Sequence, residues 1–276
     1  MLLKFNIIME QYFSGEKLYG DDFSIEQIKE WYKCEEEAYA DLYGITDSKD
    51  DYNHDLNLVH AYKYLPDRKF DSVLGLGSSW GYEFIPIIPK INKLNIIDSS
   101  IKTSSNKIDD IIPIYSKANI DGRIDFEDDS FDLITCISVL HHIPNVSYVV
   151  SELVRVLKPG GYLIIREPIV SMGDWRYKRK GVTSCERGIP YKIMRKILTN
   201  NEVEIIHESF FSIGVHRLYK YFKYYKCLHF LYLMYLYLDL LLSKMFLFNV
   251  HYKSNSIFDK LSPSSVSYVL YKRTNK

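Results

Sequence analysis

Apolar and polar positions alternate along the chain in blocks that are typical of strands and helices following one another. The expected strands are 71–77, 93–98, 111–115, 130–140, 161–168 and 202–211. The expected helices are 80–88, 145–161 and 190–201. The stretch 130–140 is mostly apolar, as a strand covered on both faces should be. Strands that alternate with helices predict a parallel, doubly wound α/β sheet, with ligands at the carboxyl ends of its strands.

The two ends of the chain have different patterns. Residues 1–55 are polar-rich, with a helix expected between a cap at Ser24 and Gly44 and with Ile25, Ile28, Tyr32 and Tyr39 along one face. Residues 215–250 are apolar and tyrosine-rich, without Pro or Gly, and 264–273 alternates as a final strand. The predicted organisation is listed in order: helical lid 1–55, nucleotide-type domain 56–213, helical insertion 214–262 and final strand 263–276.

Composition narrows the function classes. Lys+Arg and Asp+Glu both total 35, so a generic nucleic-acid binder, which normally has a basic excess, is disfavoured. The four cysteines form no CxxC pair, which fits a reducing compartment without a disulfide framework. The opening MLLKFNIIMEQ is too short an apolar run for a signal peptide, and we expect a cytoplasmic protein.

The stretch FDSVLGLGSSWGYEF, 70–84, predicts a buried strand that runs into a glycine turn. Glycine at the end of a first strand permits positive φ and close approach of the backbone to a ligand. Asp98 closes the second strand, 17 residues after Gly81. A carboxylate at that point can accept hydrogen bonds from both ribose hydroxyls. The combination favours a nucleoside site over a turn that serves packing alone.

These segments resemble those of the class I S-adenosylmethionine (SAM) dependent methyltransferases. VLGLGSSWG resembles the first motif of that family, IIDSS the second, and SFDLITCISVLHHIPN and ELVRVLKPGGYLIIREP the fourth and fifth strands with their helix. The resemblance implies a Rossmann-like sheet of seven strands, the seventh antiparallel between the fifth and sixth. It also implies SAM as the cofactor. The implied cofactor contacts are Gly75, Gly77, Ser78, Ser79, Gly81, Asp98, Ser99 and Asp121.

Two positions depart from the family pattern. Gly75 stands where the first motif usually carries an acid, and Ser79 stands in place of its middle glycine. The acid near adenine has two candidates, Asp121 and Asn119. A non-catalytic SAM-binding or scaffold protein is therefore the alternative to an enzyme. A dinucleotide-dependent oxidoreductase is the third hypothesis, disfavoured because the turn lacks a GxGxxG pattern.

Methyl transfer from a sulfonium requires alignment of donor and acceptor, and a hydroxyl acceptor also requires a base. His141 and His142 follow the fourth strand at the ligand edge, and His141 is slightly favoured as the catalytic base. His54 and His60 are alternatives on the lid side. No metal is expected.

The loop after the fifth strand is rich in charged and aromatic residues. Arg166, Glu167 and Trp175 lie nearest the strand end and are expected to bind the acceptor, together with His54. Charged groups beside an aromatic platform suit a polar small molecule or a sugar. The resemblance is closest to bacterial enzymes that methylate surface polysaccharides or their precursors, so O-methylation is the predicted reaction.

The insertion 215–250 has three interpretations. Asp239 and Lys244 interrupt its apolar run, which argues against a transmembrane span. A cap over the acceptor or a homodimer surface is the first choice. Contact with the inner membrane face, through basic residues mixed with tyrosines ahead of the leucines, is the second.

Overall fold

The computed structural model describes residues 9–42, 52–99, 107–175, 177, 179, 182–183, 185–213, 229–256 and 258–274. The side chains of residues 36–42 and 229 are not part of this description. The predicted helix end at Gly44 and the residues 214–228 of the insertion lie outside the described residues.

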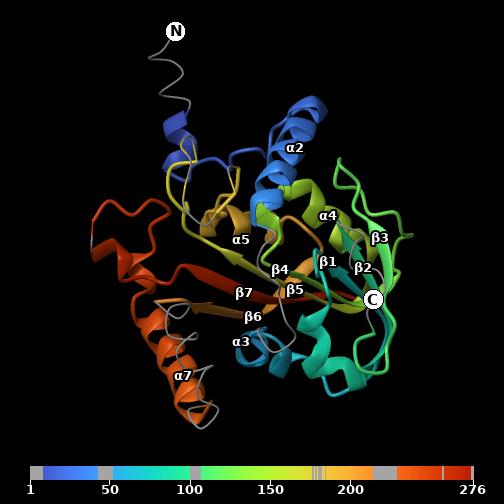
Figure 1. Cartoon of the computed structure of the whole chain (residues 1–276). Coiled ribbons are helices and arrows are strands. Elements are labelled where there is room, and N and C mark those ends of the chain that lie inside the picture. The colour runs from blue at the N-terminus through green and yellow to red at the C-terminus, as the bar shows by residue number, and fades with distance from the viewer. Residues whose placement is uncertain are drawn as a thin grey trace.

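A seven-stranded sheet forms the centre of the molecule (Figure 1). Its strands are β1 (Phe70–Leu76), β2 (Ile91–Asp98), β3 (Ile114–Lys117), β4 (Phe131–Ile137), β5 (Leu157–Pro168), β6 (Val203–Phe211) and β7 (Ser265–Lys272). The spatial order is β3-β2-β1-β4-β5-β7-β6. β7 is antiparallel to both of its neighbours, and the pairs among β1 to β5 are parallel. The predicted Rossmann-like sheet with an antiparallel last strand is confirmed.

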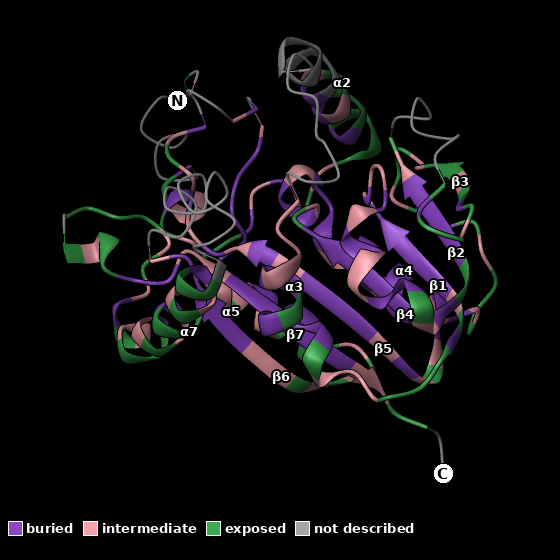
Figure 2. Cartoon of the chain, turned by 60° about the horizontal axis from the view of Figure 1, so that its bottom comes forward, coloured by how far each residue is buried: buried purple, intermediate pink, exposed green. Residues whose placement is uncertain are grey.

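Helices cover both faces of this sheet. The helices α4 (Val146–Val156) and α5 (Tyr191–Thr199) lie on one face, with α2 (Ile25–Leu42) beyond them (Figure 1). The helix α3 (His54–His60) and the 3₁₀ segment η3 (Tyr82–Lys90) cover the other face, and α7 (His229–Met245) packs against β6 and α3. In Figure 2 the central strands β1, β4, β5 and β7 are mostly buried, because they lie between two apolar layers, whereas the edge strand β3 and the first half of β6 are partly exposed.

Some predicted boundaries are wrong for local reasons. The expected helix at 80–88 is a 3₁₀ segment, since Pro86 and Pro89 cannot donate the backbone hydrogen bonds of an α-helix. The helix expected to reach residue 161 ends at Val156, and Lys158 to Gly161 already belong to β5. These differences move element ends and leave the order of elements as predicted.

The predicted start of α2 is confirmed, while its buried face differs. Ser24 Oγ accepts from the N–H of Gln27, and the Gln27 side chain accepts from the N–H of Ser24, which is a capping box. The buried positions are Ile28, Trp31 and Glu35, whereas Ile25 is exposed. A glutamate on the inward face was not expected, and its partner lies in the site described below.

The helix α7 also has an unexpected distribution of residues. Asp239 is buried and accepts hydrogen bonds from the N–H groups of Ser212 and Ile213, both at 2.9 Å. It therefore binds the backbone where β6 ends, and it is not part of the exposed apolar face of α7. The outer face carries exposed apolar side chains of Phe230, Leu231, Met234, Tyr237, Leu238, Leu241 and Met245. Within the described part of the chain, no helix has both the length and the apolar character needed to cross a membrane.

Candidate functional site

The turn after β1 has the backbone conformation that the glycine pattern predicts. Gly77, Ser79 and Gly81 all have positive φ, of 65°, 46° and 69°. Ser79 thus adopts the left-handed conformation that glycine adopts without strain, at a cost on the order of 1–2 kcal/mol. The N–H of Ser79 donates to the Asp98 carboxylate at 2.9 Å. This hydrogen bond connects the turn to the end of β2, although Ser79 stands in place of the middle glycine of the motif.

Side chains of the protein, and not open space for a ligand, lie beside Gly75 and Gly77. A Cβ on Gly77 would lie 2.5 Å from Val139, so the glycine allows the segment after β4 to approach the turn. A Cβ on Gly75 would lie 2.2 Å from Ser78 Oγ. The absence of a side chain at Gly75 therefore makes room for the Ser78 side chain, and not for a ligand. The consequence for Gly77 is that a larger residue would disturb packing as well as any ligand.

A buried carboxylate, that of Glu83, is bonded to two residues next to Gly75, the position where the family pattern has its acid. The Glu83 carboxylate accepts hydrogen bonds from Ser78 Oγ at 2.9 Å and from Thr135 Oγ1 at 2.6 Å. Thr135 is the β4 partner of Gly75 in the sheet. Burial raises the pKa of Glu83, and the two hydroxyl hydrogen bonds oppose that shift. No sequence signal identified Glu83, because it lies eight residues beyond the position that the motif uses.

The remaining predicted cofactor residues lie around Asp98. Asp98 is half-buried, Ser99 is exposed, and the carbonyl of Asp98 accepts from the N–H of Ala118, where the next loop begins. Asp121 in that loop is exposed, and its Oδ1 accepts from the N–H of Arg123 at 3.0 Å. The structure therefore brings Gly77, Ser79 and Asp98 together and places Asp121 on the neighbouring loop. A half-buried carboxylate next to an open backbone turn suits the ribose and amino-acid ends of SAM.

His141 and His142 lie in a 3₁₀ turn, η5 (Leu140–His142), that Glu167 holds in place. The Glu167 carboxylate accepts from the N–H groups of Val139, Leu140 and His141. Its Oε2 also lies 2.6 Å from His141 Nδ1. Glu167 is 1% exposed, so it orients this turn and is not placed to touch an acceptor. Its expected substrate contact is corrected on that ground.

His142 points toward the lid helix. Its Nδ1 lies 2.9 Å from Glu35 Oε2 of α2, and its carbonyl accepts from Trp31 Nε1 at 2.7 Å. Both Glu35 oxygens accept from Thr183 Oγ1, at 2.7 and 2.8 Å. The side chain of His142 is 21% exposed and that of His141 is 8% exposed. Geometry thus reverses the slight preference for His141, because His142 is the more accessible ring.

Two further residues complete this region and were missed by sequence reasoning. Glu186 Oε1 lies 3.6 Å from His141 Nε2, while its Oε2 accepts from the N–H of Thr183 at 2.9 Å. Arg187 is fully buried and donates to the carbonyls of Tyr19 and His141, among others. Both residues belong to a charged loop whose members looked alike in the sequence.

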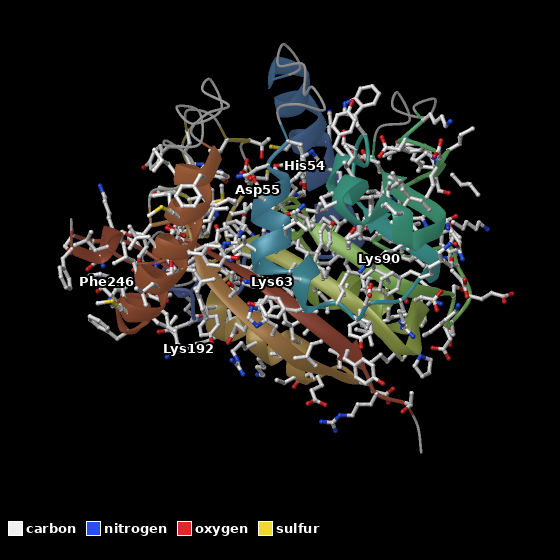
Figure 3. The ribbon with its side chains drawn as sticks, turned by 90° about the horizontal axis from the view of Figure 1, so that it is seen from below. His54, Asp55, Lys63, Lys90, Lys192 and Phe246 are labelled. Atoms are coloured by element: carbon white, nitrogen blue, oxygen red, sulfur yellow. The ribbon has the colours of Figure 1, made fainter. Side chains whose placement is uncertain are left out.

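The other predicted acceptor residues lie elsewhere. Arg166 extends to the opposite face of the sheet, where it donates to the Asn57 side chain of α3. His54 lies at the start of α3 with Asp55 (Figure 3), and its ring is 5.1 Å from that of Tyr52. Trp175 is buried and stacks on Phe13 at 4.2 Å. The structure therefore corrects Trp175 from an aromatic platform to a core residue that anchors the N-terminal segment.

Two cysteines meet beside the histidines, although the sequence shows them 151 residues apart. Cys34 of α2 and Cys185 of the charged loop have their sulfur atoms 3.0 Å apart. Burial raises the pKa of Cys185, and the neighbouring Cys34 adds to that shift, so this residue is a thiol at neutral pH. The pair ties the lid helix to the loop that carries Glu186.

Comparisons with known proteins, like the strand order of the sheet, indicate similarity to methyltransferases. Residues 73–165 match the family described as the methyltransferase domain. The chain is 30% identical over 111 residues to 27-O-demethylrifamycin SV methyltransferase of Amycolatopsis mediterranei, covering 37% of this chain and 40% of that protein. It is 39% identical over 84 residues to phthiotriol/phenolphthiotriol dimycocerosates methyltransferase 1 of Mycobacterium ulcerans, covering 29% of this chain and 31% of that protein.

A solved structure with the same fold is phosphoethanolamine N-methyltransferase 2 of Haemonchus contortus, with S-adenosylhomocysteine bound. Its TM-score is 0.53 at 13% identity, over 80% of this chain and 53% of that one. The chain spans 40% or less of the length of the two curated relatives. The matched domain, residues 73–165, contains the glycine turn and most of the strands β1 to β5. Fold and matched domain together support the resemblance to class I SAM-dependent methyltransferases, with SAM as the cofactor.

Proposed function

We propose that this protein transfers a methyl group from SAM to an oxygen of a polar small molecule or a sugar. One observation carries the proposal. The left-handed turn at 77–81 is bonded through the Ser79 N–H to Asp98, at the carboxyl ends of adjacent strands in a sheet of methyltransferase order. A surface-polysaccharide precursor, suggested by resemblance alone, is the proposed acceptor class.

Asp98 is the proposed ribose ligand, and the turn at 77–81 is the proposed cradle for the amino-acid end of the cofactor. Glu83 supplies, through the Ser78 hydroxyl, the carboxylate that position 75 lacks. Since Ser79 and Glu83 replace the two missing features in space, the departures from the motif do not by themselves argue for a degenerate copy.

His142, assisted by His141, is the proposed base for the acceptor hydroxyl. An imidazole oriented by a carboxylate can take a proton near neutral pH, and Glu35 holds His142 in that way. When bound, SAM would supply the methyl group, the residues of the turn and Asp98 would hold the cofactor for transfer to the acceptor oxygen, and the helix α2 would close the acceptor side. We also propose that the apolar outer face of α7 binds a second copy of the chain. The proposed location of the protein is the cytoplasm.

Calorimetry with SAM, S-adenosylhomocysteine and NAD tests the cofactor assignment. Replacing Asp98 by Ala should cost about 1.5–3 kcal/mol of SAM binding free energy, because a charged hydrogen-bond acceptor is lost. Asp71→Ala, at the opposite end of β1, is the matched control and should leave SAM affinity unchanged. Unchanged affinity in Asp98→Ala, or binding of NAD and not of SAM, would contradict the proposal.

The alternative function is a SAM-binding scaffold without turnover. The buried, carboxylate-bound state of His141 favours it, since a ring held on both sides is poorly placed to exchange protons. Methyl transfer from radiolabelled SAM to extracted small molecules and sugar precursors separates the two. Tight SAM binding without product formation in any fraction supports the scaffold.

A further inference from the structure

Three side chains at the acceptor edge converge on one point. Each of His141, His142 and Glu186 offers a ligand atom, and these atoms lie within 4.8 Å of one another. His141 Nε2 is 3.6 Å from Glu186 Oε1. Two ligands on one tetrahedral zinc ion are about 3.3 Å apart, given metal–ligand bonds near 2.0–2.1 Å. The separation of His141 and Glu186 is therefore close to that of two ligands on one ion, and the third ligand atom lies within 4.8 Å of both.

The outer partners of both rings are those of a metal site. His141 Nδ1 lies 2.6 Å from Glu167, and His142 Nδ1 lies 2.9 Å from Glu35. A metal-binding histidine almost always donates its other ring N–H to a carboxylate, a carbonyl or water, which fixes the tautomer. For His141, Nδ1 faces Glu167 and Nε2 faces Glu186, so Nε2 is the nitrogen that would bind the ion.

The outer carboxylates are themselves held in place. Three backbone N–H groups bind Glu167, and Thr183 Oγ1 binds Glu35. The Thr183 N–H binds Glu186 through Oε2, on the far oxygen from His141. Arg187, the fully buried cation nearby, donates to backbone carbonyls such as those of His141 and Ile143. Three buried carboxylates thus surround two imidazoles, and a divalent cation would offset their charge.

We infer that His141, His142 and Glu186 bind a divalent transition-metal ion at the acceptor edge of the sheet. Two imidazoles and one carboxylate suit Zn²⁺ or Fe²⁺ better than Mg²⁺ or Ca²⁺, which prefer oxygen ligands throughout. Three protein ligands leave a position for an acceptor oxygen. The side chain of His142 is 21% exposed, so the site is not closed to solvent. In that role the ion would lower the pKa of the acceptor hydroxyl, and His142 would act as its ligand in place of the proposed role as base, a consequence that rests on the proposed methyl transfer.

The test measures metal binding in the absence of SAM and acceptor. Untagged, EDTA-treated protein is titrated with Zn²⁺ by calorimetry and with Co²⁺ by visible absorption. One ion per chain is expected. Glu186→Gln and His142→Ala should abolish measurable binding, while Glu35→Gln, which removes an outer partner, should weaken it about 10–100-fold.

Two controls keep the result specific. His251→Ala alters an exposed histidine far along the sequence and should leave the affinity unchanged. The double variant Cys34→Ser, Cys185→Ser removes the neighbouring thiols, and it should also bind Co²⁺ with the wild-type spectrum. Loss of binding in that double variant, or a thiolate charge-transfer band in the wild type, would assign the ion to the cysteines and overturn the inference.

Folding and function are separated by further readouts. Circular dichroism of each EDTA-treated variant shows whether it is folded, and the wild-type melting temperature should rise on adding Zn²⁺ even if a variant fails to fold. No binding of Zn²⁺ or Co²⁺ by the wild type, or equal affinity in Glu186→Gln, would overturn the inference. If methyl transfer persists in EDTA, the proposed function holds and the metal site is not needed for it. If the protein binds the ion but transfers no methyl group, the metal site holds and the proposed function does not.

Discussion

The helices α2 and α7 are both additions to the central sheet, and among their described side chains each has one buried carboxylate. On α2 that residue is Glu35, which holds an imidazole of the acceptor edge. On α7 it is Asp239, which accepts two backbone N–H groups where β6 ends. The same chemical group thus orients a reactive ring in one helix and closes a strand in the other.

The outer faces of the two helices differ as well. The first turns of α2 expose mainly polar residues, such as Glu26, Lys29 and Glu30, whereas the outer face of α7 is apolar from Phe230 to Met245. A solvated outer face suits a lid that moves in water, and a large apolar one suits a partner. The comparison shows that α2 contacts the histidine turn, whereas the inward carboxylate of α7 binds the backbone where β6 ends.

The largest expected effect lies where α2 meets the site. His142→Ala should lower the methyl-transfer rate by about 100-fold or more, since a base or a metal ligand is lost, while SAM affinity stays unchanged. Single-turnover kinetics with labelled SAM, beside calorimetry of SAM binding, measures the two. Full turnover in the variant would remove α2 and its histidine from the chemistry.

The next effect separates Asp239 from Glu35. Asp239→Ala leaves two buried N–H groups without an acceptor and should lower the free energy of unfolding by about 1–3 kcal/mol. Turnover per folded molecule should not change. Urea unfolding and active-site titration give both quantities. A stable variant with low turnover would show that α7 serves the reaction too.

A smaller effect is expected for the carboxylate of α2. Glu35→Gln should lower turnover about 10-fold, because a hydrogen bond to a charged group is worth about 1.5–3 kcal/mol and the amide retains part of it. Ser147→Ala, which removes a hydroxyl that pairs with Asp21 outside the histidine turn, is the control. Equal losses in both variants would indicate a general loosening of the lid.

The pH dependence of stability sharpens the comparison further. Burial raises the pKa of Asp239, against the two backbone hydrogen bonds that lower it. The folded protein therefore binds this proton more tightly than the unfolded chain. Its contribution to stability is complete below the unfolded pKa, near 3.9, and declines as pH rises through the folded value. Urea unfolding should show a larger deficit of Asp239→Ala at pH 4 than at pH 7, and a deficit that grows with pH would contradict the shift.

The smallest effect on stability is expected on the outer face of α7. Met234→Gln with Leu238→Gln should change the free energy of unfolding by no more than about 0.5 kcal/mol, because both side chains are exposed. Light scattering should nonetheless show loss of self-association. A wild type that is monomeric and floats with anionic vesicles would favour the membrane interpretation of this face.

Sequence reasoning succeeded where the signal is local or periodic. The succession of strands along the chain and the turn at 77–81 beside Asp98 followed from apolar blocks and glycine spacing, whereas the place of β7 between β5 and β6 was implied by the family resemblance. The histidine environment could not be predicted, because Glu35 lies 107 residues from His142 in the sequence. Likewise, nothing local distinguishes the buried Glu186 from the other charges of its loop. Pairings across such distances depend on tertiary packing, which residue patterns do not encode.

The contacts of the N-terminal segment have a consequence for synthesis of the chain. The hydrogen-bond partner of the Tyr19 carbonyl, Arg187, is synthesised 168 residues later. The partner of Glu35, Thr183, is synthesised 148 residues later. At about 5–20 residues per second, a ribosome needs on the order of 10–30 s to deliver these partners. During that interval Ile28 and Trp31, both buried in the finished protein, have no core to enter. The helix α2 can therefore make these contacts only after residues 183–187 have been synthesised, and its apolar side chains stay exposed on the nascent chain until then.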